Sequence, residues 1–187
     1  LNTGPHFVDW AVCYQGFKKP DEILCAMDRA NTFGDAEDYV KVVLKKKGAP
    51  VVDLEISSCD AYPGDMLTVH GTQGGLSGGA GGLRWRYFNP KTAPKQKLIR
   101  KPLPGPSYCR ETLKFTEKSW APSKGQADAF SWMSKQFYDH LHKVLRDGAK
   151  LEITPQQVRV QMAVMEECHR QAKLSKLPAK GWPSGNR

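Results

Sequence analysis

Alternation of apolar and polar side chains through about one hundred central residues is the strongest constraint on this fold. Such alternation sends successive side chains to opposite faces of a strand, so that one face can be buried. Leu83, Trp85 and Tyr87, for example, alternate with Arg84 and Arg86. The alternating segments are EILCAMDRA, DYVKVVLKK, VVDLEISS, DMLTVHG, LRWRYF and ETLKFTEKSW. We therefore expect the central part of the chain to consist mainly of strands.

The connections between these segments favour antiparallel pairing. The first two segments flank NTFGDAED, a turn-rich connection suited to a hairpin. No helical pattern separates the later segments, whereas parallel neighbours need long crossover connections. The pattern predicts a largely antiparallel sheet of about six or seven strands.

A glycine-rich run, HGTQGGLSGGAGGLRWRY, covers residues 70–87. It could cradle a phosphate or form a hairpin connection. A dinucleotide loop needs G-x-G-x-x-G between a strand and a helix, but Arg84 stands where the third glycine belongs and a strand pattern follows. A P-loop needs Gly-Lys-Ser or Gly-Lys-Thr, and neither occurs. We expect the run to join two antiparallel strands.

Helical patterns flank the strand-rich region. Thr3, Gly4 and Pro5 suit a helix start, and Gly16 suits its end. A second helix is predicted after the Ser123-x-x-Gln126 pattern, with an end at Asp147-Gly148. Its apolar stripe would be Phe130, Met133, Phe137, Leu141 and Val144 or Leu145.

A third helix is predicted to open at Thr154-Pro155-Gln156-Gln157. Val158, Met162 and Met165 follow at helical spacing, and we expect the two methionines to lie in the core. The fold class is therefore α+β, with helices packed on one face of the sheet and the other face available for oligomerisation.

Length and composition are those of a folded domain. The 187 residues suffice for one core, and no apolar run is long enough to span a membrane. The beginning has no signal-peptide pattern and no initiator Met, which a fragment, processing or omitted residues would explain. The cysteines lack a C-x-x-C pair, so we expect reduced thiols in a cytoplasmic protein. They are Cys13, Cys25, Cys59, Cys109 and Cys168.

The formal charge of +9 comes from 28 Lys and Arg residues against 19 Asp and Glu residues. Basic residues are spread over residues 45–47, 91–101 and 173–180. This spread favours solvated faces and a basic tail over a nucleic-acid site, which would combine clustered bases with stacking aromatics. Binding of an anionic small substrate or of an anionic partner surface is the alternative interpretation of this charge.

The candidate site lies at the start of the first predicted helix. His6, Asp9 and Trp10 can share one face, and Asn2 lies four residues before His6. The positive end of the helix dipole favours a neutral, proton-accepting imidazole. A histidine here is also compatible with a purely structural role. Asp9 would either orient the His6 ring or satisfy backbone amides.

Several stretches resemble one protein family. LNTGPHFVDWAV is similar to the helix that opens the second domain of the glucose–fructose oxidoreductase/inositol dehydrogenase (Gfo/Idh/MocA) family. GDAEDYVKVVL, the glycine-rich run and TPQQVRVQMAVMEECHRQ resemble later stretches, in the same order. The resemblance extends to about Gln171.

The resemblance implies that residues 1–172 form the C-terminal substrate and oligomerisation domain of an NAD(P)-dependent oxidoreductase, followed by a basic polar tail at residues 173–187. NAD or NADP would then bind an N-terminal Rossmann domain absent from this chain, and none is expected on the chain alone. His6 corresponds to the family's general base. Asn2 replaces its acidic partner and can hydrogen-bond a substrate hydroxyl but cannot exchange a proton.

The resemblance to this family also implies binding partners. These are the Rossmann domain of the same protein, a sugar, polyol or related small alcohol, and a second copy through the open sheet face; no membrane and no nucleic acid are expected. The alternative is a non-catalytic binding or assembly module that keeps the fold but has lost proton transfer, as Asn2 suggests.

Overall fold

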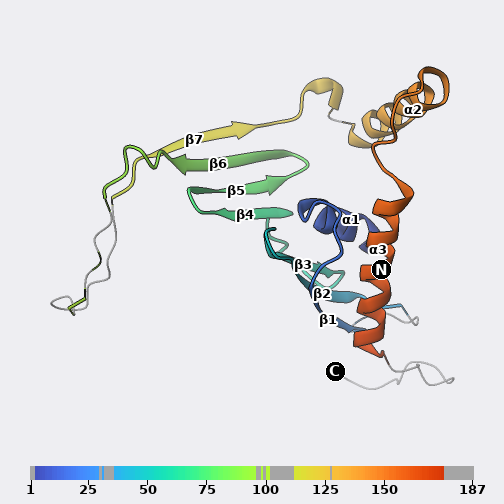
Figure 1. The fold of residues 1–187 in the computed structure, drawn as a ribbon, viewed down its shortest axis with the longest axis horizontal. Helices are drawn as coiled ribbons and strands as arrows, with labels where there is room; N and C mark the ends of the chain where they lie inside the picture. Colours follow the sequence, from blue (N-terminus) through green and yellow to red (C-terminus); the bar gives the residue numbers. More distant parts are fainter. Residues whose placement is uncertain are drawn as a thin grey trace. The chain divides into compact units, whose positions relative to one another are not determined.

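The computed structural model describes residues 3–29, 31, 36–95, 98, 100–101, 112–126 and 128–174. The elements in chain order are α1 (Gly4–Tyr14), β1 (Glu22–Asp28), β2 (Tyr39–Lys45), β3 (Val52–Ser57), β4 (Leu67–Gly71), β5 (Gly74–Gly79), β6 (Gly82–Phe88), β7 (Phe115–Trp120), the 3-10 turn η1 (Lys124–Gln126), α2 (Ala129–Asp147) and α3 (Pro155–Ala172) (Figure 1).

The strands form two antiparallel sheets, so the fold class α+β is confirmed but the single sheet of six or seven strands is wrong. β1-β2-β3 form a three-stranded sheet and β4-β5-β6-β7 a four-stranded one. The segment between β3 and β4, SCDAYPGDM, contains Pro63 and Gly64. Proline donates no ladder hydrogen bond, and glycine is unfavourable in a strand. This segment therefore ends one ladder before the next begins.

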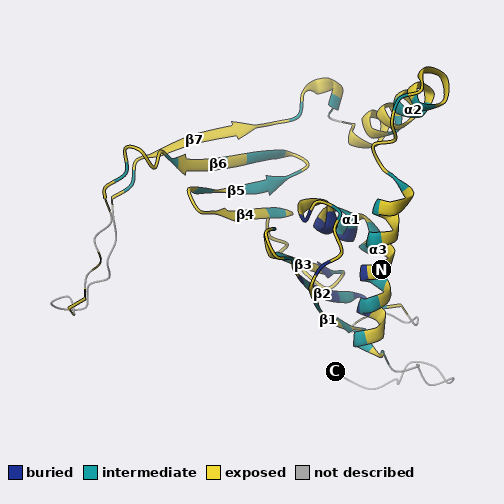
Figure 2. Ribbon diagram, in the orientation of Figure 1, coloured by how far each residue is buried: buried dark blue, intermediate teal, exposed yellow. Residues whose placement is uncertain are grey.

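The chain divides into two compact units at the same point. One unit comprises Leu1–Ala61 with Lys150–Arg187, and therefore holds α1, α3 and the three-stranded sheet. The other comprises Tyr62–Ala149 and holds the four-stranded sheet, η1 and α2. Buried positions gather in the first unit, whereas the second is coloured almost entirely as intermediate or exposed (Figure 2).

The core of the first unit lies between α1, α3 and one face of the three-stranded sheet. Apolar side chains alternate along β2, where Val40, Val42 and Leu44 are buried. They pack with residues that recur at helical spacing on the two helices. These are Val8, Ala11 and Val12 of α1 and Val164 and Cys168 of α3.

The other face of the three-stranded sheet carries ion pairs. Lys41 of β2 lies 2.8 Å from an Asp53 carboxylate oxygen and 2.9 Å from one of Glu55. Lys45 lies 2.8 Å from Glu22 on β1. Opposite charges on paired strands satisfy one another, so this face is suited to water rather than to an apolar partner.

Side-chain amides connect the helices of the first unit to their surroundings. Gln15, just after α1, is buried and its Nε2 donates to the carbonyls of Leu44 and Pro50, both at 3.1 Å. Gln171 on α3 accepts from the Cys25 amide at 2.9 Å and donates to the Ile23 carbonyl at 2.8 Å. These contacts hold α1 to β2 and α3 to β1.

The predicted start and end of α1 and the predicted start of α3 are confirmed. α1 begins with Pro5 in its first turn, and Gly16 adopts the left-handed conformation after its end, with φ +70°. The Thr3 side chain makes no capping hydrogen bond. At α3 the capping box forms between Thr154 and Gln157.

The glycine-rich run is a strand with a tight turn at each end, not a loop between two strands. β5 consists of its residues 74–79, and the two-residue turns 72–73 and 80–81 join it to β4 and β6. Small residues are required by close backbone approach, because a Cβ at Gly74 would overlap the Arg86 carbonyl oxygen. Gly78 has φ +146°, which L side chains rarely adopt. No helix follows the run, so it has no phosphate-cradling geometry.

The second helix differs from its prediction at its start and in its burial. Ser123 and Gln126 do bond to each other, but they close the turn η1, and Asp128 caps α2 by accepting from the Ser131 amide. None of the residues of α2 is buried. Within its predicted core stripe, Phe130 is 78% exposed and Leu145 71%. The stripe therefore does not form a core in this chain.

Only one of the two α3 methionines that were predicted to lie in the core does so. Met165 packs against the core, whereas Met162 is 55% exposed. Val164 and Cys168 take the buried positions, which shifts the core stripe around the helix. Of the predicted tail, only Lys173 and Leu174 are described, and the later residues lie outside the described part of the chain.

Candidate functional site

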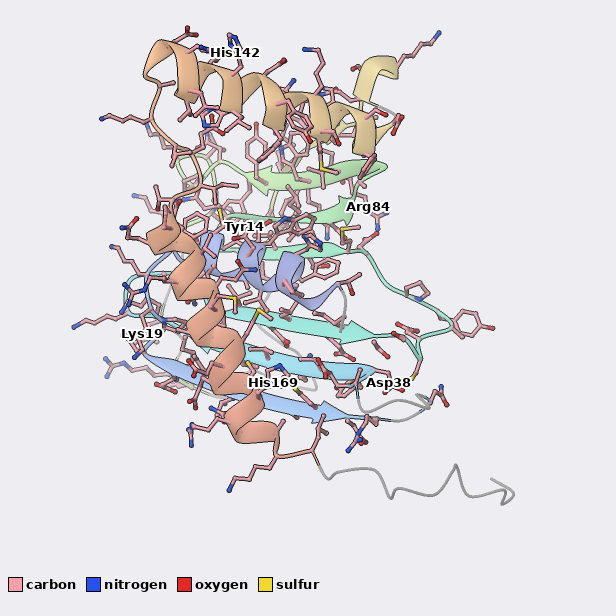
Figure 3. All side chains as sticks on the ribbon, turned by 90° about the vertical axis from the view of Figure 1, so that its right-hand side faces the viewer. Tyr14, Lys19, Asp38, Arg84, His142 and His169 are labelled. Atoms are coloured by element: carbon pink, nitrogen blue, oxygen red, sulfur yellow. The ribbon has the colours of Figure 1, made fainter. Side chains whose placement is uncertain are left out.

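The outward face of α1 carries the candidate site. Val8, Ala11 and Val12 bury one side of this helix against the sheet. At 3.6 residues per turn, His6, Asp9, Trp10, Cys13 and Tyr14 fall on the other side. Tyr14 is labelled near the end of α1 in Figure 3, which also labels His169 on α3. His6, Asp9 and Trp10, which share a face by their spacing in the sequence, lie on this one side of the helix.

His6 is exposed in the first turn of α1. This turn contains no acidic residue, so the positive end of the helix is not neutralised there by a side chain of the same turn. An exposed imidazole can reach a ligand from outside the chain, which a histidine sealed in the core could not do. The position is therefore compatible with proton exchange.

Asp9 is half-buried, one turn after His6. Among the described residues, the two side chains have no hydrogen bond or ion pair with each other, so the structure supports a shared face rather than a bonded pair. Asn2, the third predicted site residue, lies outside the described residues. The proposed sites at His6, Asp9 and Asn2 therefore stay predictions.

The backbone beneath His6 is held from α3. Gln161 Nε2 donates to the Pro5 carbonyl at 2.6 Å, across more than 150 residues of sequence. The sequence does not predict this contact, because a glutamine within an amphipathic helix gives no signal of what it bonds. The contact fixes the entry of α1, and hence the backbone that carries His6, relative to α3.

Aromatic side chains share the outward face of α1 with His6. Trp10 and Tyr14 are each 46% exposed, although large aromatics usually lie in cores or interfaces. Phe7 contacts Trp10 edge to face, with ring centroids 5.5 Å apart. The face therefore combines a titratable ring with exposed apolar surface.

Behind the helix start lies a cavity of only about 40 Å³, and it does not include His6. Gly4, Pro5 and Val8 line it together with Met165 and Cys168 of α3. Its volume suits no substrate. This cavity is therefore no candidate for a substrate site, and a ligand that reaches His6 would bind on the outward face of α1.

The interior thiols are unsuited to nucleophilic catalysis. Burial raises the pKa of Cys168 to about 12 and also raises the pKa of Cys25. Both remain free thiols, as do Cys13 and Cys59, while Cys109 lies outside the described residues. A thiol with a raised pKa is a poor source of thiolate at neutral pH.

The described part of the chain contains no group of three or more His, Cys, Asp or Glu residues placed to bind a metal ion. None of the helices described here combines the length and the hydrophobicity that crossing a bilayer requires.

No protein-family model matches the sequence, and no curated protein matches it significantly. Solved structures do match its fold. An oxidoreductase from Bacillus cereus matches with a TM-score of 0.67 and 16% identity, over 95% of this chain and 52% of its own. An NAD-binding protein from Listeria innocua matches with a TM-score of 0.59 and 14% identity, over 92% and 49% of the two chains.

UDP-N-acetylglucosamine 3-dehydrogenase GnnA from Acidithiobacillus ferrooxidans matches with a TM-score of 0.60 and 13% identity, over 90% of this chain and 47% of its own. The chain therefore spans about half the length of the solved structures it matches. The fold of this chain is similar to that of about half of each of these solved structures.

Proposed function

We propose that this chain is the C-terminal, substrate-side and oligomerisation domain of a two-domain NAD(P)-dependent oxidoreductase of the Gfo/Idh/MocA family. The observation that carries the proposal is the outward face of α1, where an exposed His6 and exposed aromatics lie opposite a fully packed inner face. Such a face is suited to a second domain. Matches covering nearly all of this chain but only half of the solved oxidoreductases support the same arrangement.

The cofactor would bind that second domain. The described residues do not fit a dinucleotide, because the glycine-rich run is strand β5 within an antiparallel sheet and has no following helix. Of the solved structures with this fold, one is an NAD-binding protein and another is a UDP-N-acetylglucosamine 3-dehydrogenase. In this chemistry a nicotinamide accepts a hydride from the substrate carbon.

The role of this chain would be to bind the alcohol and to take its proton. His6, exposed at the start of α1, would accept the hydroxyl proton on a ring nitrogen as the carbon loses its hydride. Asn2 and Asp9 would hydrogen-bond substrate hydroxyls, which suits a sugar, polyol or related small alcohol. Asn2 cannot itself exchange a proton, so His6 would carry proton transfer alone.

The test uses the whole two-domain protein. His6→Ala should reduce turnover of a responsive polyol by about 100-fold or more while NAD(P) affinity stays within about twofold. His142→Ala, at an exposed position of α2, is the matched control and should leave turnover unchanged. Wild-type turnover in His6→Ala would remove His6 from the mechanism. Cofactor binding without hydride transfer across a polyol panel would instead favour the non-catalytic module.

A further inference from the structure

One face of the four-stranded sheet carries polar side chains around a glycine. His70 of β4 pairs with Gly75 of β5, Gly75 with Arg86 of β6, and Arg86 with Glu117 of β7. Residues paired in this way project to the same face of an antiparallel sheet. Because Gly75 has no side chain, a gap separates His70 from Arg86.

This gap belongs to a depression of about 440 Å³, which we call the Gly75 hollow. Its polar lining includes His70, Ser77, Arg84, Arg86 and Glu117. The volume suits a small organic molecule. All the lining residues belong to one unit, so the hollow does not depend on how the two units are arranged.

The neighbouring register pair on this face, Ser77 and Arg84, already binds a carboxylate of the chain itself. Arg84 Nη2 lies 3.2 Å from Asp65 Oδ2, and the Ser77 hydroxyl donates to the same oxygen. The Ser77 hydroxyl and then the Arg84 charge hold the pKa of Asp65 below its ordinary value. This face therefore provides the donors and the positive charge that an anionic group requires. Figure 3 labels Arg84 among these strands.

Arg86 and Glu117 remain available to a ligand. The guanidinium carbon of Arg86 lies 5.0 Å from the centroid of the Phe115 ring. Stacking on a ring fixes the plane of the guanidinium and leaves its edge donors free. Although Arg86 and Glu117 are register partners, they form no ion pair with each other or with another described residue. Arg86 thus borders the gap as a donor group, and Glu117 lies beside Arg86 on the next strand as an acceptor group.

We propose that the Gly75 hollow binds a small molecule that carries both an anionic group and hydroxyl groups, such as a phosphorylated or carboxylated sugar. His70 and the Arg86 guanidinium bind the anionic group over Gly75, and Glu117 accepts a hydrogen bond from a hydroxyl. Glu117 would repel a bare anion, so the hydroxyl is part of what the hollow recognises. The inference does not rest on the proposed oxidoreductase function, because it concerns binding and not turnover.

The experiment titrates the full 187-residue chain by calorimetry with glucose 6-phosphate, gluconate, orthophosphate and glucose. At least one of the two anionic sugars should bind about tenfold or more tightly than glucose. Which of them binds distinguishes phosphate from carboxylate recognition. Orthophosphate should bind more weakly than the favoured anionic sugar, because it offers Glu117 no sugar hydroxyl.

Variants then locate the site. Arg86→Gln should weaken binding of the favoured anionic sugar by about tenfold, whereas Arg159→Gln, which removes an equal charge from α3 in the other unit, should not. Phe115→Leu keeps Arg86 but removes its stacking partner and should weaken binding a few-fold, which keeps the test valid if Arg86→Gln misfolds. Circular dichroism verifies the fold of each variant.

Three results would overturn the proposal. They are equal affinity for glucose and both anionic sugars, equal losses in Arg86→Gln and Arg159→Gln, and tighter binding of orthophosphate than of either anionic sugar.

Discussion

The two sheets of this protein are built from the same alternating pattern but reach different degrees of burial. In the three-stranded sheet, Leu44 is 0% exposed beneath α1 and α3, and the opposite face is occupied by ion pairs. In the four-stranded sheet, Val69, Tyr87 and Trp120 are exposed although they belong to its apolar face. Alternation alone therefore makes a strand, whereas burial requires a helix with a complementary face.

The largest expected difference between the two units is in core energetics. Leu44→Ala should lower the free energy of unfolding by about 2–5 kcal/mol, because it removes a fully buried side chain and leaves a cavity. Leu145→Ala on α2 should change it by less than about 0.5 kcal/mol, because that side chain is 71% exposed. Urea unfolding followed by circular dichroism measures both. A loss above 2 kcal/mol at Leu145 would show that α2 is covered by a partner.

The second prediction concerns the apolar face of the four-stranded sheet. The register places three large apolar side chains on this face, those of Val69, Leu76 and Trp85. We propose that this face pairs with a second copy of the chain. Trp85→Lys should weaken the dimer by about 100-fold, because it replaces a large apolar side chain with a second charge beside Lys118, its register partner. Light scattering at micromolar concentration measures the molecular mass of the unchanged chain and of the Trp85→Lys variant.

A control separates this face from the other sheet. Leu24→Lys introduces the same charge on the ion-paired face of the three-stranded sheet, where Leu24 is 61% exposed, and should leave the mass unchanged. A monomeric wild-type chain would contradict the proposed dimer, and dissociation by Leu24→Lys alone would move the interface to the three-stranded sheet.

The smallest expected effects come from surface charges, which occur in both units. The Arg170 guanidinium, followed by the Gln171 amide, lowers the pKa of Glu167 to about 2 from 4.5. A depressed carboxyl pKa stabilises the folded state above the unfolded value of 4.5, and this stabilisation is lost as pH falls towards 2. Carboxyl chemical shifts measured against pH should show the low midpoint, and Arg170→Gln should raise it. A Glu167 midpoint near 4.5 in the unchanged chain would show that the pair does not form in solution.

Asp65 in the four-stranded unit provides the comparison. The Ser77 hydroxyl is the main cause of its lowered pKa, so Ser77→Ala should raise the Asp65 midpoint more than Arg84→Gln does. The reverse order would mean that charge, rather than the hydrogen bond, controls this carboxylate.

Sequence patterns predicted those parts of the fold that depend on neighbouring residues. Thr154 and Gln157 form the predicted capping box because both partners lie within one helical turn. Leu54 and Ile56 face the core side of β3, as their alternation with Glu55 and Ser57 predicted. His6 and Asp9 lie on the outward side of α1 because Val8 and Ala11 direct the inward side to the core.

Other features could not be predicted from the same patterns. β5 is rich in glycine and has neither the side chains nor the propensity of a strand, so only its pairing with β4 and β6 makes it one. The Gly75 hollow follows from that pairing, because His70 and Arg86 meet across a residue that carries no side chain. The anchoring of Pro5 by Gln161 is equally non-local.

By itself, the sequence determined where most of the helices and strands form, with β5 as the exception, since capping, turn geometry and periodicity act over a few residues. Tertiary structure decided that the strands divide into two sheets, that the stripe of α2 stays exposed, and which polar side chains meet. The physical reason is that burial and strand pairing are free energies of contacts between distant segments, and a local pattern specifies a face without specifying what covers it.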